Sequence, residues 1–147
     1  MKKILTIAVE ITGEERVKGF TGGAAMLFFT GSAGGDFFHG AVSGVGTDTQ
    51  KEVNGKMTLS ARYILKGKDY TGKKCSIFIE NNAEMRNEDA GVPFITHPVI
   101  LTDSENLAWM ETGKVSGKLI PGEKGPVIEI YSESVLTSGG QYGNNAD

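Results

Sequence analysis

Two neighbouring stretches of alternating apolar and polar residues limit what this chain can fold into. In Met57–Lys66 the apolar residues fall at every second position, with Ile64 as the only break, and Lys73–Asn82 continues the same pattern. A period of two places one face of a β-strand on a core and the other in solvent. The two stretches therefore predict an antiparallel β-hairpin with a loop at Gly67–Gly72.

Matching the apolar faces of the two strands predicts their register, because a shift by one residue would turn every apolar side chain outward. The expected pairs are Leu65 with Cys75, Tyr63 with Ile77 and Ala61 with Ile79. The apolar face then ends at Asn81, beside Leu59, and this amide is the first indication of a site. Arg62 falls on the opposite, outer face, near Glu80.

The rest of the chain reads as short strands separated by turns. The chain has 21 glycines, which fall between the apolar runs as they do at the turns and bulges of all-β domains. The other predicted strands are Ile4–Thr12, Ala24–Thr30, Asp36–Ser43, Thr47–Val53, Val92–Leu101, Leu107–Val115, Lys118–Ile120 and Val127–Ser132. We expect a charged loop at Gly13–Gly23 and a loop or a single helical turn at Ala83–Gly91.

This pattern predicts an all-β fold, an antiparallel closed β-barrel of about eight strands with little or no helix. Closure is favoured because it removes exposed strand edges. The chain of 147 residues fits one barrel domain over residues 1–135, followed by a flexible polar tail over residues 136–147.

Charge and composition exclude several classes of function. The net charge of −3 offers no basic footprint for nucleic acid, and no apolar run is long enough to span a membrane. Cys75 is the single cysteine and lies among apolar alternates, which predicts a buried, inert thiol in the cytoplasm. His39 and His97 have no further ligands at metal-binding spacing, so we expect neither a metal nor another cofactor.

Short segments in order along the chain resemble a bacterial family of uncharacterised proteins, domain of unknown function 3237. The matching segments are Gly22-Gly23, Gly46–Gln50, Ala61-Arg62-Tyr63, Ile77-Phe78-Ile79 with Asn81, Phe94 with Thr96 and Pro98, Ala108-Trp109, Gly113, Gly117 and Gly125–Tyr131. The resemblance implies a barrel of about eight strands in the style of small lipid-binding and allene-oxide-cyclase-like barrels. It implies no activity. The chain departs from the family in a short Ala83–Val92 segment and in Glu111, where an Asn is expected.

Alternation along the later strands suggests which side chains face the lumen of the barrel. The candidate ligand-binding residues are Asp48, Tyr63, Asn81, Phe94, Thr96, Trp109 and Glu111. Apolar walls with a few convergent polar groups suit a small-molecule pocket. Glu111 favours a pocket because burying an unpaired carboxylate is costly.

Three functions remain open from the sequence. The first is binding of a small apolar or aromatic molecule in the barrel. The second is an isomerase, cyclase or hydrolase that uses Glu111 or Asp48 as a general acid or base beside Tyr63 or Asn81. The third is a filled structural barrel that acts by forming a homo-oligomer, since eight strands leave room for side chains alone or for one small ligand.

Overall fold

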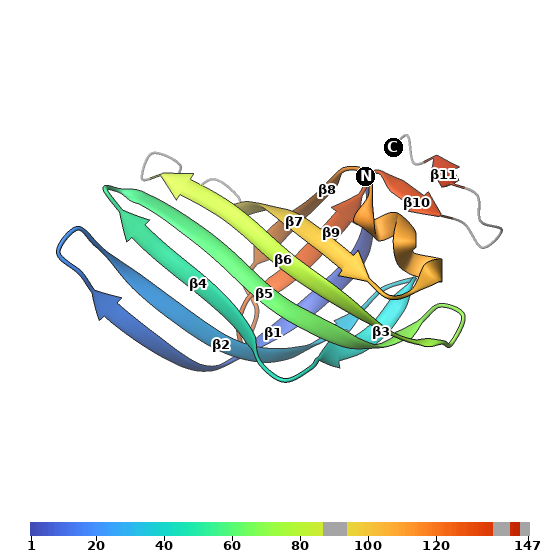
Figure 1. Ribbon diagram of the computed structural model, residues 1–147, viewed down its shortest axis with the longest axis horizontal. Helices are drawn as coiled ribbons and strands as arrows, with labels where there is room; N and C mark the ends of the chain where they lie inside the picture. The colour runs from blue at the N-terminus through green and yellow to red at the C-terminus, as the bar shows by residue number, and fades with distance from the viewer. Residues whose placement is uncertain (87–93, 137–141, 145–147) are drawn as a thin grey trace.

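The computed structural model of the chain describes residues 1–86, 94–136 and 142–144, and Figure 1 shows its strands. In chain order they are β1 (Lys2–Lys18), β2 (Gly22–Gly34), β3 (Phe38–Val42), β4 (Gly46–Val53), β5 (Lys56–Asp69), β6 (Lys74–Arg86), β7 (Phe94–Thr102), β8 (Val115–Ile120), β9 (Val127–Ser132), β10 (Ser134–Leu136) and β11 (Tyr142–Asn144). A 3₁₀ helix, Glu105–Glu111, lies between β7 and β8.

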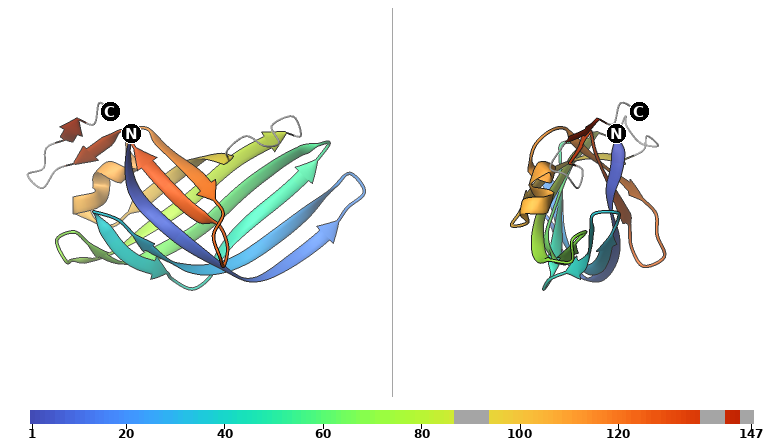
Figure 2. Two further views of the ribbon diagram at one scale, coloured as in Figure 1. Left: turned by 180° about the vertical axis from the view of Figure 1, so that it is seen from behind. Right: turned by 90° about the vertical axis from the view of Figure 1, so that its right-hand side faces the viewer.

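Strands β1 to β9 form one antiparallel sheet that closes on itself, because β1 pairs with both β2 and β9. Strands β3 and β4 share a single position in this sheet, since each pairs with β2 on one side and β5 on the other. The result is a closed antiparallel barrel of eight strands, as predicted. Figure 2 shows its cross-section when the molecule is turned by 90°.

The central hairpin forms as expected, but its register differs from the prediction by two residues. Leu65 pairs with Ile77, Tyr63 with Ile79 and Ala61 with Asn81. The apolar faces still coincide, because a shift of two preserves the face. The turn is tighter than predicted: the Asp69 amide donates a hydrogen bond to the Lys73 carbonyl, the Asp69 carbonyl accepts one from the Gly72 amide, and Gly72 adopts a left-handed φ of 90°.

The N-terminal hairpin is longer than predicted, and the expected charged loop at Gly13–Gly23 is wrong. A β-bulge between Ile11 and Gly13 absorbs the break in alternation, and β1 then continues in register with β2 as far as Lys18 opposite Gly23. By contrast, β9 pairs with β1 only up to Ala8. One end of β1, β2, β4, β5 and β6 therefore projects beyond β7 to β9 as a curved sheet (Figure 1).

The predicted strand Leu107–Val115 is also wrong. Its first part is the 3₁₀ helix, whose Leu107, Trp109 and Met110 are almost completely buried, while β8 begins only at Val115. The spacing of these three residues fits a short helix with one buried face better than a strand. They pack into the same core as Leu65, Ile77 and Ile130 and so fill one end of the barrel.

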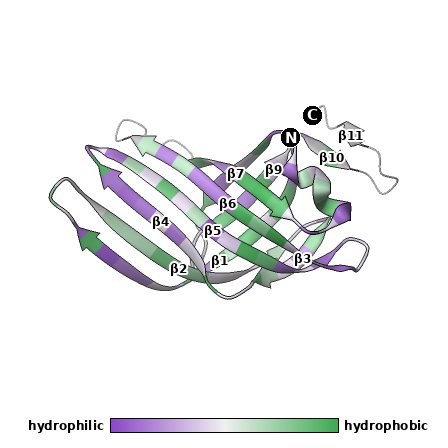
Figure 3. Ribbon diagram, in the orientation of Figure 1, coloured by the Kyte–Doolittle hydropathy of each residue, from purple (hydrophilic) through white to green (hydrophobic). Residues whose placement is uncertain are grey.

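Beyond the barrel, Ser134–Leu136 and Tyr142–Asn144 pair as a two-stranded sheet that includes part of the predicted flexible tail. The predicted turn at Ala83–Gly91 begins instead as the last residues of β6, and residues 87–91 lie outside the described residues. Figure 3 shows a mainly hydrophilic β4 and a mainly hydrophobic β7. Within the described ranges, no helix has the length and apolar character needed to cross a membrane.

Candidate functional site

A cavity of about 220 Å³ occupies the end of the lumen opposite the 3₁₀ helix. All eight strand positions of the barrel contribute to its wall, which is mostly apolar. The lining residues are Val9, Ile11, Leu27, Phe29, Asp48, Gln50, Leu59, Ala61, Asn81, Thr96, Leu119, Pro126 and Ile128. A dry cavity of about 150 Å³ can hold benzene, so this space suits a molecule of one or two rings.

Four side-chain polar atoms in this region are buried without a hydrogen-bond partner among the described residues. They are Asp48 Oδ1, Tyr63 Oη, Asn81 Oδ1 and Thr96 Oγ1. Three of them belong to residues that line the cavity. An unsatisfied buried polar group costs about 1–3 kcal/mol, and most proteins contain only a few. Their concentration at one cavity needs a physical explanation.

The register explains why Asp48 and Asn81 both reach this space. Asp48 pairs with Ala61, and Ala61 pairs with Asn81, so the two polar residues flank a methyl group in one row across β4, β5 and β6. The small side chain between them leaves the centre of the row open. A ligand group could therefore lie over Ala61 and accept or donate hydrogen bonds on both sides.

Gly117 completes the polar end of the cavity. A Cβ atom at this position would collide with Thr96 Oγ1 and would lie 3.5 Å from Asn81 Oδ1. Thr96 is paired with Gly117 across β7 and β8, so the absence of a side chain there makes room for the Thr96 hydroxyl close to Asn81 Oδ1. The φ of Gly117 is not in the left-handed region, so a glycine is needed here for the close approach of the Thr96 side chain and not for the backbone conformation.

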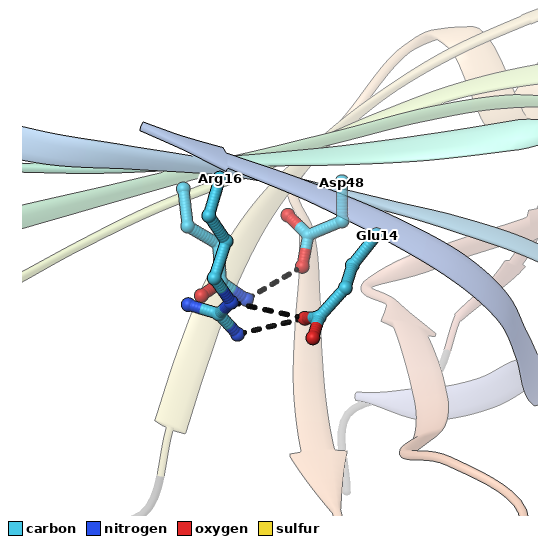
Figure 4. Close-up of polar contacts among 4 residues, drawn as sticks. Glu14, Arg16 and Asp48 are labelled. Carbon is cyan, nitrogen blue, oxygen red and sulfur yellow. Dashed lines mark hydrogen bonds and ion pairs between the residues drawn. The ribbon is translucent and has the colours of Figure 1, made fainter. Parts of the chain in front are cut away.

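Asp48 lines the cavity, and its side chain lies near that of Glu14 (Figure 4). Its Oδ2 accepts a hydrogen bond of 3.0 Å from Gln50 Nε2, which leaves Oδ1 unpaired. Burial raises the pKa of this carboxyl, and the hydrogen bond from Gln50 offsets only part of the increase. A raised pKa brings a carboxyl nearer to the range in which it can exchange protons.

Tyr63 lies one inward position deeper than Ala61 on β5, at the boundary between the cavity and the filled core. Its side chain is only 3% exposed, and its ring packs edge-to-face on that of Phe29, a cavity residue, with 5.4 Å between centroids. Burial raises the pKa of its hydroxyl. Tyr63 thus supports the floor of the cavity without lining it.

The structure brings Asp48, Asn81 and Thr96 together but not Trp109 and Glu111, so the hypothesis that Asn81, Trp109 and Glu111 share a cavity is wrong. Both residues lie on the 3₁₀ helix, where Trp109 packs against Phe37 and donates a hydrogen bond of 3.0 Å to the Asn106 carbonyl.

Glu111 is exposed and accepts a hydrogen bond of 2.8 Å from the Thr102 backbone. The argument for a pocket that rested on Glu111 is therefore wrong, and it is the half-buried Asp48 whose carboxyl keeps one oxygen, Oδ1, buried without a partner among the described residues. Phe94 begins β7, but its side chain falls outside the described residues.

Sequence reasoning missed the contribution of Gly117, Leu119 and Ile128 to the site. A glycine within a strand signals either a bulge or a close approach of another group, so the sequence alone did not single out Gly117. Leu119 and Ile128 lie within the predicted strands Lys118–Ile120 and Val127–Ser132. Only the closure of the barrel brings them to the same cavity as Asp48 and Asn81.

A second polar cluster holds the filled end of the barrel together. The buried carboxylate of Asp69 accepts hydrogen bonds from the amide and hydroxyl of Thr71, the amide of Lys73, the hydroxyl of Ser104 and the side-chain amide of Asn106. Desolvation alone would raise the pKa of Asp69, but these hydrogen bonds outweigh it and hold the pKa well below its usual range. The cluster ties the β5–β6 turn to the 3₁₀ helix.

Cys75 lies close to this cluster and is buried, as predicted. Burial and the neighbouring carboxylates of Asp69 and Asp103 raise the pKa of its thiol, which keeps it protonated at neutral pH. This environment fits a structural thiol, not a nucleophile.

Comparisons with known proteins define the fold and leave the function open. No protein-family model matches the chain, and no curated protein does. A protein of unknown function from Clostridium acetobutylicum has a similar structure, with 23% identity, a TM-score of 0.73 and coverage of 89% of this chain and 96% of that one.

A conserved protein of unknown function from Rhodopseudomonas palustris is similar at 22% identity and a TM-score of 0.70, with coverage of 88% and 93%. An enzyme from Penicillium herquei is similar at 16% identity and a TM-score of 0.67, with coverage of 89% and 91%. At these identities the likeness establishes a shared β-barrel fold alone.

Proposed function

We propose that this protein binds a small, mainly apolar molecule in the cavity of its barrel. The observation that carries the proposal is the set of unpaired oxygens of Asp48, Asn81 and Thr96 in an otherwise apolar wall. Buried polar groups without protein partners are explained if a bound molecule supplies the partners. Two of the three oxygens are acceptors, so the ligand would carry at least one hydroxyl or N–H donor.

A titration with small uncharged ring compounds tests this proposal. The probes would be phenol, indole and alkylphenols with short chains, and the readout would be calorimetric binding together with the unfolding temperature. Trp109 would not report on binding, because it lies at the filled end of the barrel. At least one probe should stabilise the protein, since a ligand specific for the folded state raises its stability by mass action.

Two leucine variants at neighbouring positions on β6 separate recognition from stability. Asn81→Leu removes an inner oxygen and should weaken binding of the best probe about threefold to tenfold, as loss of a hydrogen bond does. Asn82→Leu removes an outer amide that contacts Ser60 and should leave the affinity unchanged. A folded protein that binds none of the probes, in either variant or in the wild type, would contradict the proposal.

The raised pKa of Asp48 favours a second candidate function, proton transfer to or from the bound molecule at Oδ1. Asp48→Asn keeps the shape of the side chain and removes the exchangeable proton. If Asp48 acts as an acid or base, this variant should bind probes as the wild type does and lose any conversion of them. A variant that loses binding alone would assign Asp48 to recognition.

The remaining expectations stay predictions. A homologue that is similar in sequence both to this chain and to the family that it resembles would test membership of that family. A cytoplasmic location would be tested by fractionation, and formation of a homo-oligomer by the mass of the protein in solution.

A further inference from the structure

The inner face of the barrel continues past the cavity as an open curved surface. Beyond the last pairs with β9, β1 remains paired with β2, and β5 remains paired with β6 as far as Lys56 and Arg86. In Figures 1 and 2 this part of the sheet projects well beyond β7 to β9. A molecule that protrudes from the cavity would therefore lie along protein and not in free solvent.

A second pocket of about 330 Å³ lies on this projecting part and meets the cavity at Gln50, which lines both. Arg16 and Lys18 are the basic residues on its inner face, because Lys51 follows the inward Gln50 and also lines a pocket with the outer residue Arg62. The lining residues are Arg16, Val17, Lys18, Gly23, Ala24, Ala25, Gln50, Lys51, Glu52 and Met57. On this face Arg16 and Lys18 lie beside the carboxylates Glu14 and Glu52, whereas Asp48 is the only charged residue among the described residues of the cavity wall.

Arg16 is placed to face the mouth of the cavity. It pairs with Ala25, and Ala25 pairs with Gln50, so Arg16 occupies the inward row next to that of Asp48. Inward positions along a strand recur about every 7 Å, which is the length of a short alkyl tail. Figure 4 shows the side chains of Glu14, Arg16 and Asp48 on the same side of the sheet.

The present partner of Arg16 is easily exchanged. Its guanidinium contacts Glu14 Oε2 at 2.8 Å, two residues away on the same strand, and both side chains are more than half exposed. Exposed ion pairs of this kind contribute about 0–1 kcal/mol. A guanidinium has further N–H groups and binds a carboxylate in a planar, two-point geometry.

We propose that the site has two compartments and that its ligand is amphipathic, with an apolar head in the cavity and a carboxylate tail held by Arg16 and Lys18. This inference rests on the proposed function and specifies its ligand. The direction of binding follows from charge, because the carboxyl of Asp48 disfavours an anion within the cavity, and Arg16 and Lys18 supply cations outside it.

The test uses para-hydroxyphenyl alkanoic acids with tails of increasing length, each compared with its primary amide. The acid and the amide share a head and differ in charge, so their affinity ratio isolates the tail. For the wild type, we expect an optimum length at which the acid binds about tenfold more tightly than the amide. This preference should fall as the salt concentration rises.

Arg16→Gln should remove most of the preference for the acid and leave binding of the amide unchanged. Arg62→Gln is the matched control: Arg62 is also 63% exposed and lies 2.8 Å from a carboxylate, that of Glu80, but it is on the outer face. Its substitution should leave the ratio unchanged.

The outcomes separate the two proposals. Equal binding of acid and amide in the wild type would overturn the two-compartment inference and leave the proposed function intact. A preference that Arg16→Gln and Arg62→Gln reduce equally would also overturn it, since a general charge effect would then explain the ratio. If neither compound binds at any length, both proposals fail.

Discussion

Asn81 and Thr96, on adjacent strands of the barrel, both direct a buried side-chain oxygen at the space above Gly117, and within the described structure neither oxygen has a hydrogen-bond partner. The Thr96 hydroxyl can lie there because position 117 has no Cβ. A barrel that needed only stability would pair the two oxygens or replace them with apolar groups.

Thr96→Val should therefore leave the unliganded protein as stable as the wild type or raise its free energy of unfolding by up to about 2 kcal/mol. Valine has the same shape and removes only the unpaired hydroxyl. Chemical denaturation would measure the change. Thr102→Val is the control, because the Thr102 hydroxyl donates a hydrogen bond of 2.8 Å to the Ser76 carbonyl and its loss should cost about 1 kcal/mol. Equal losses in the two variants would mean that Thr96 has a partner.

At Tyr63, loss of the unpaired hydroxyl and loss of the ring should affect stability differently. Tyr63→Phe retains the ring against Phe29 and removes an unpaired hydroxyl, so we expect no loss of stability. Tyr63→Ala should cost about 3–5 kcal/mol through the cavity that it creates. Arg62→Ala, on the outer face, should cost less than about 1 kcal/mol. A large loss in Tyr63→Phe would show that the hydroxyl is bonded in solution.

Asp48 should make the protein less stable as pH rises. Its pKa in the folded state lies above the value in the unfolded chain, so the folded state holds more protons between the two values. Stability then falls as pH increases through that interval, which begins near the ordinary pKa of about 4. Asp48→Asn removes this dependence. Its stability relative to the wild type should rise from acid to neutral pH, and a constant difference would contradict the assignment.

Asp69 should behave in the opposite way. Its pKa is lowered in the folded state, so its contribution is complete at neutral pH and is lost as pH falls below the ordinary value of about 4. Asp69→Asn should cost on the order of 3 kcal/mol at neutral pH, because several buried donors lose a charged acceptor. The cost should shrink on acidification. If it does not, the carboxylate is not the acceptor that holds the turn and helix together.

The parts of the fold that depend on alternation could be predicted from sequence. The inward faces of β5 and β6 follow from Tyr63, Leu65, Ile77 and Ile79, and those faces were identified correctly even though the register was off by two residues. Alternation specifies a face, whereas register also depends on the turn. The tight turn closed by Asp69 uses side-chain hydrogen bonds that the pattern of apolar residues does not reveal.

The site was predicted only in part, because alternation identifies inward side chains only where the chain forms a regular strand. Asp48, Asn81 and Thr96 lie in regular strands, so their faces could be inferred and they do meet. Trp109 and Glu111 lie in a 3₁₀ helix whose period differs from that of a strand, and this difference moved both residues away from the cavity. The importance of Gly117 depends on contact between strands and could not be inferred from its neighbours in the sequence.

The central claim is that the unpaired oxygens around the cavity are satisfied by a bound molecule. The most direct measurement is a crystallographic screen in which crystals are soaked with small hydroxylated ring compounds. We predict electron density for a probe inside the barrel, with a polar atom within hydrogen-bond distance of Asn81 Oδ1, Thr96 Oγ1 or Asp48 Oδ1. A structure in which Asn81 and Thr96 bond to each other across a closed cavity, with probes found only on the outer surface, would contradict the account.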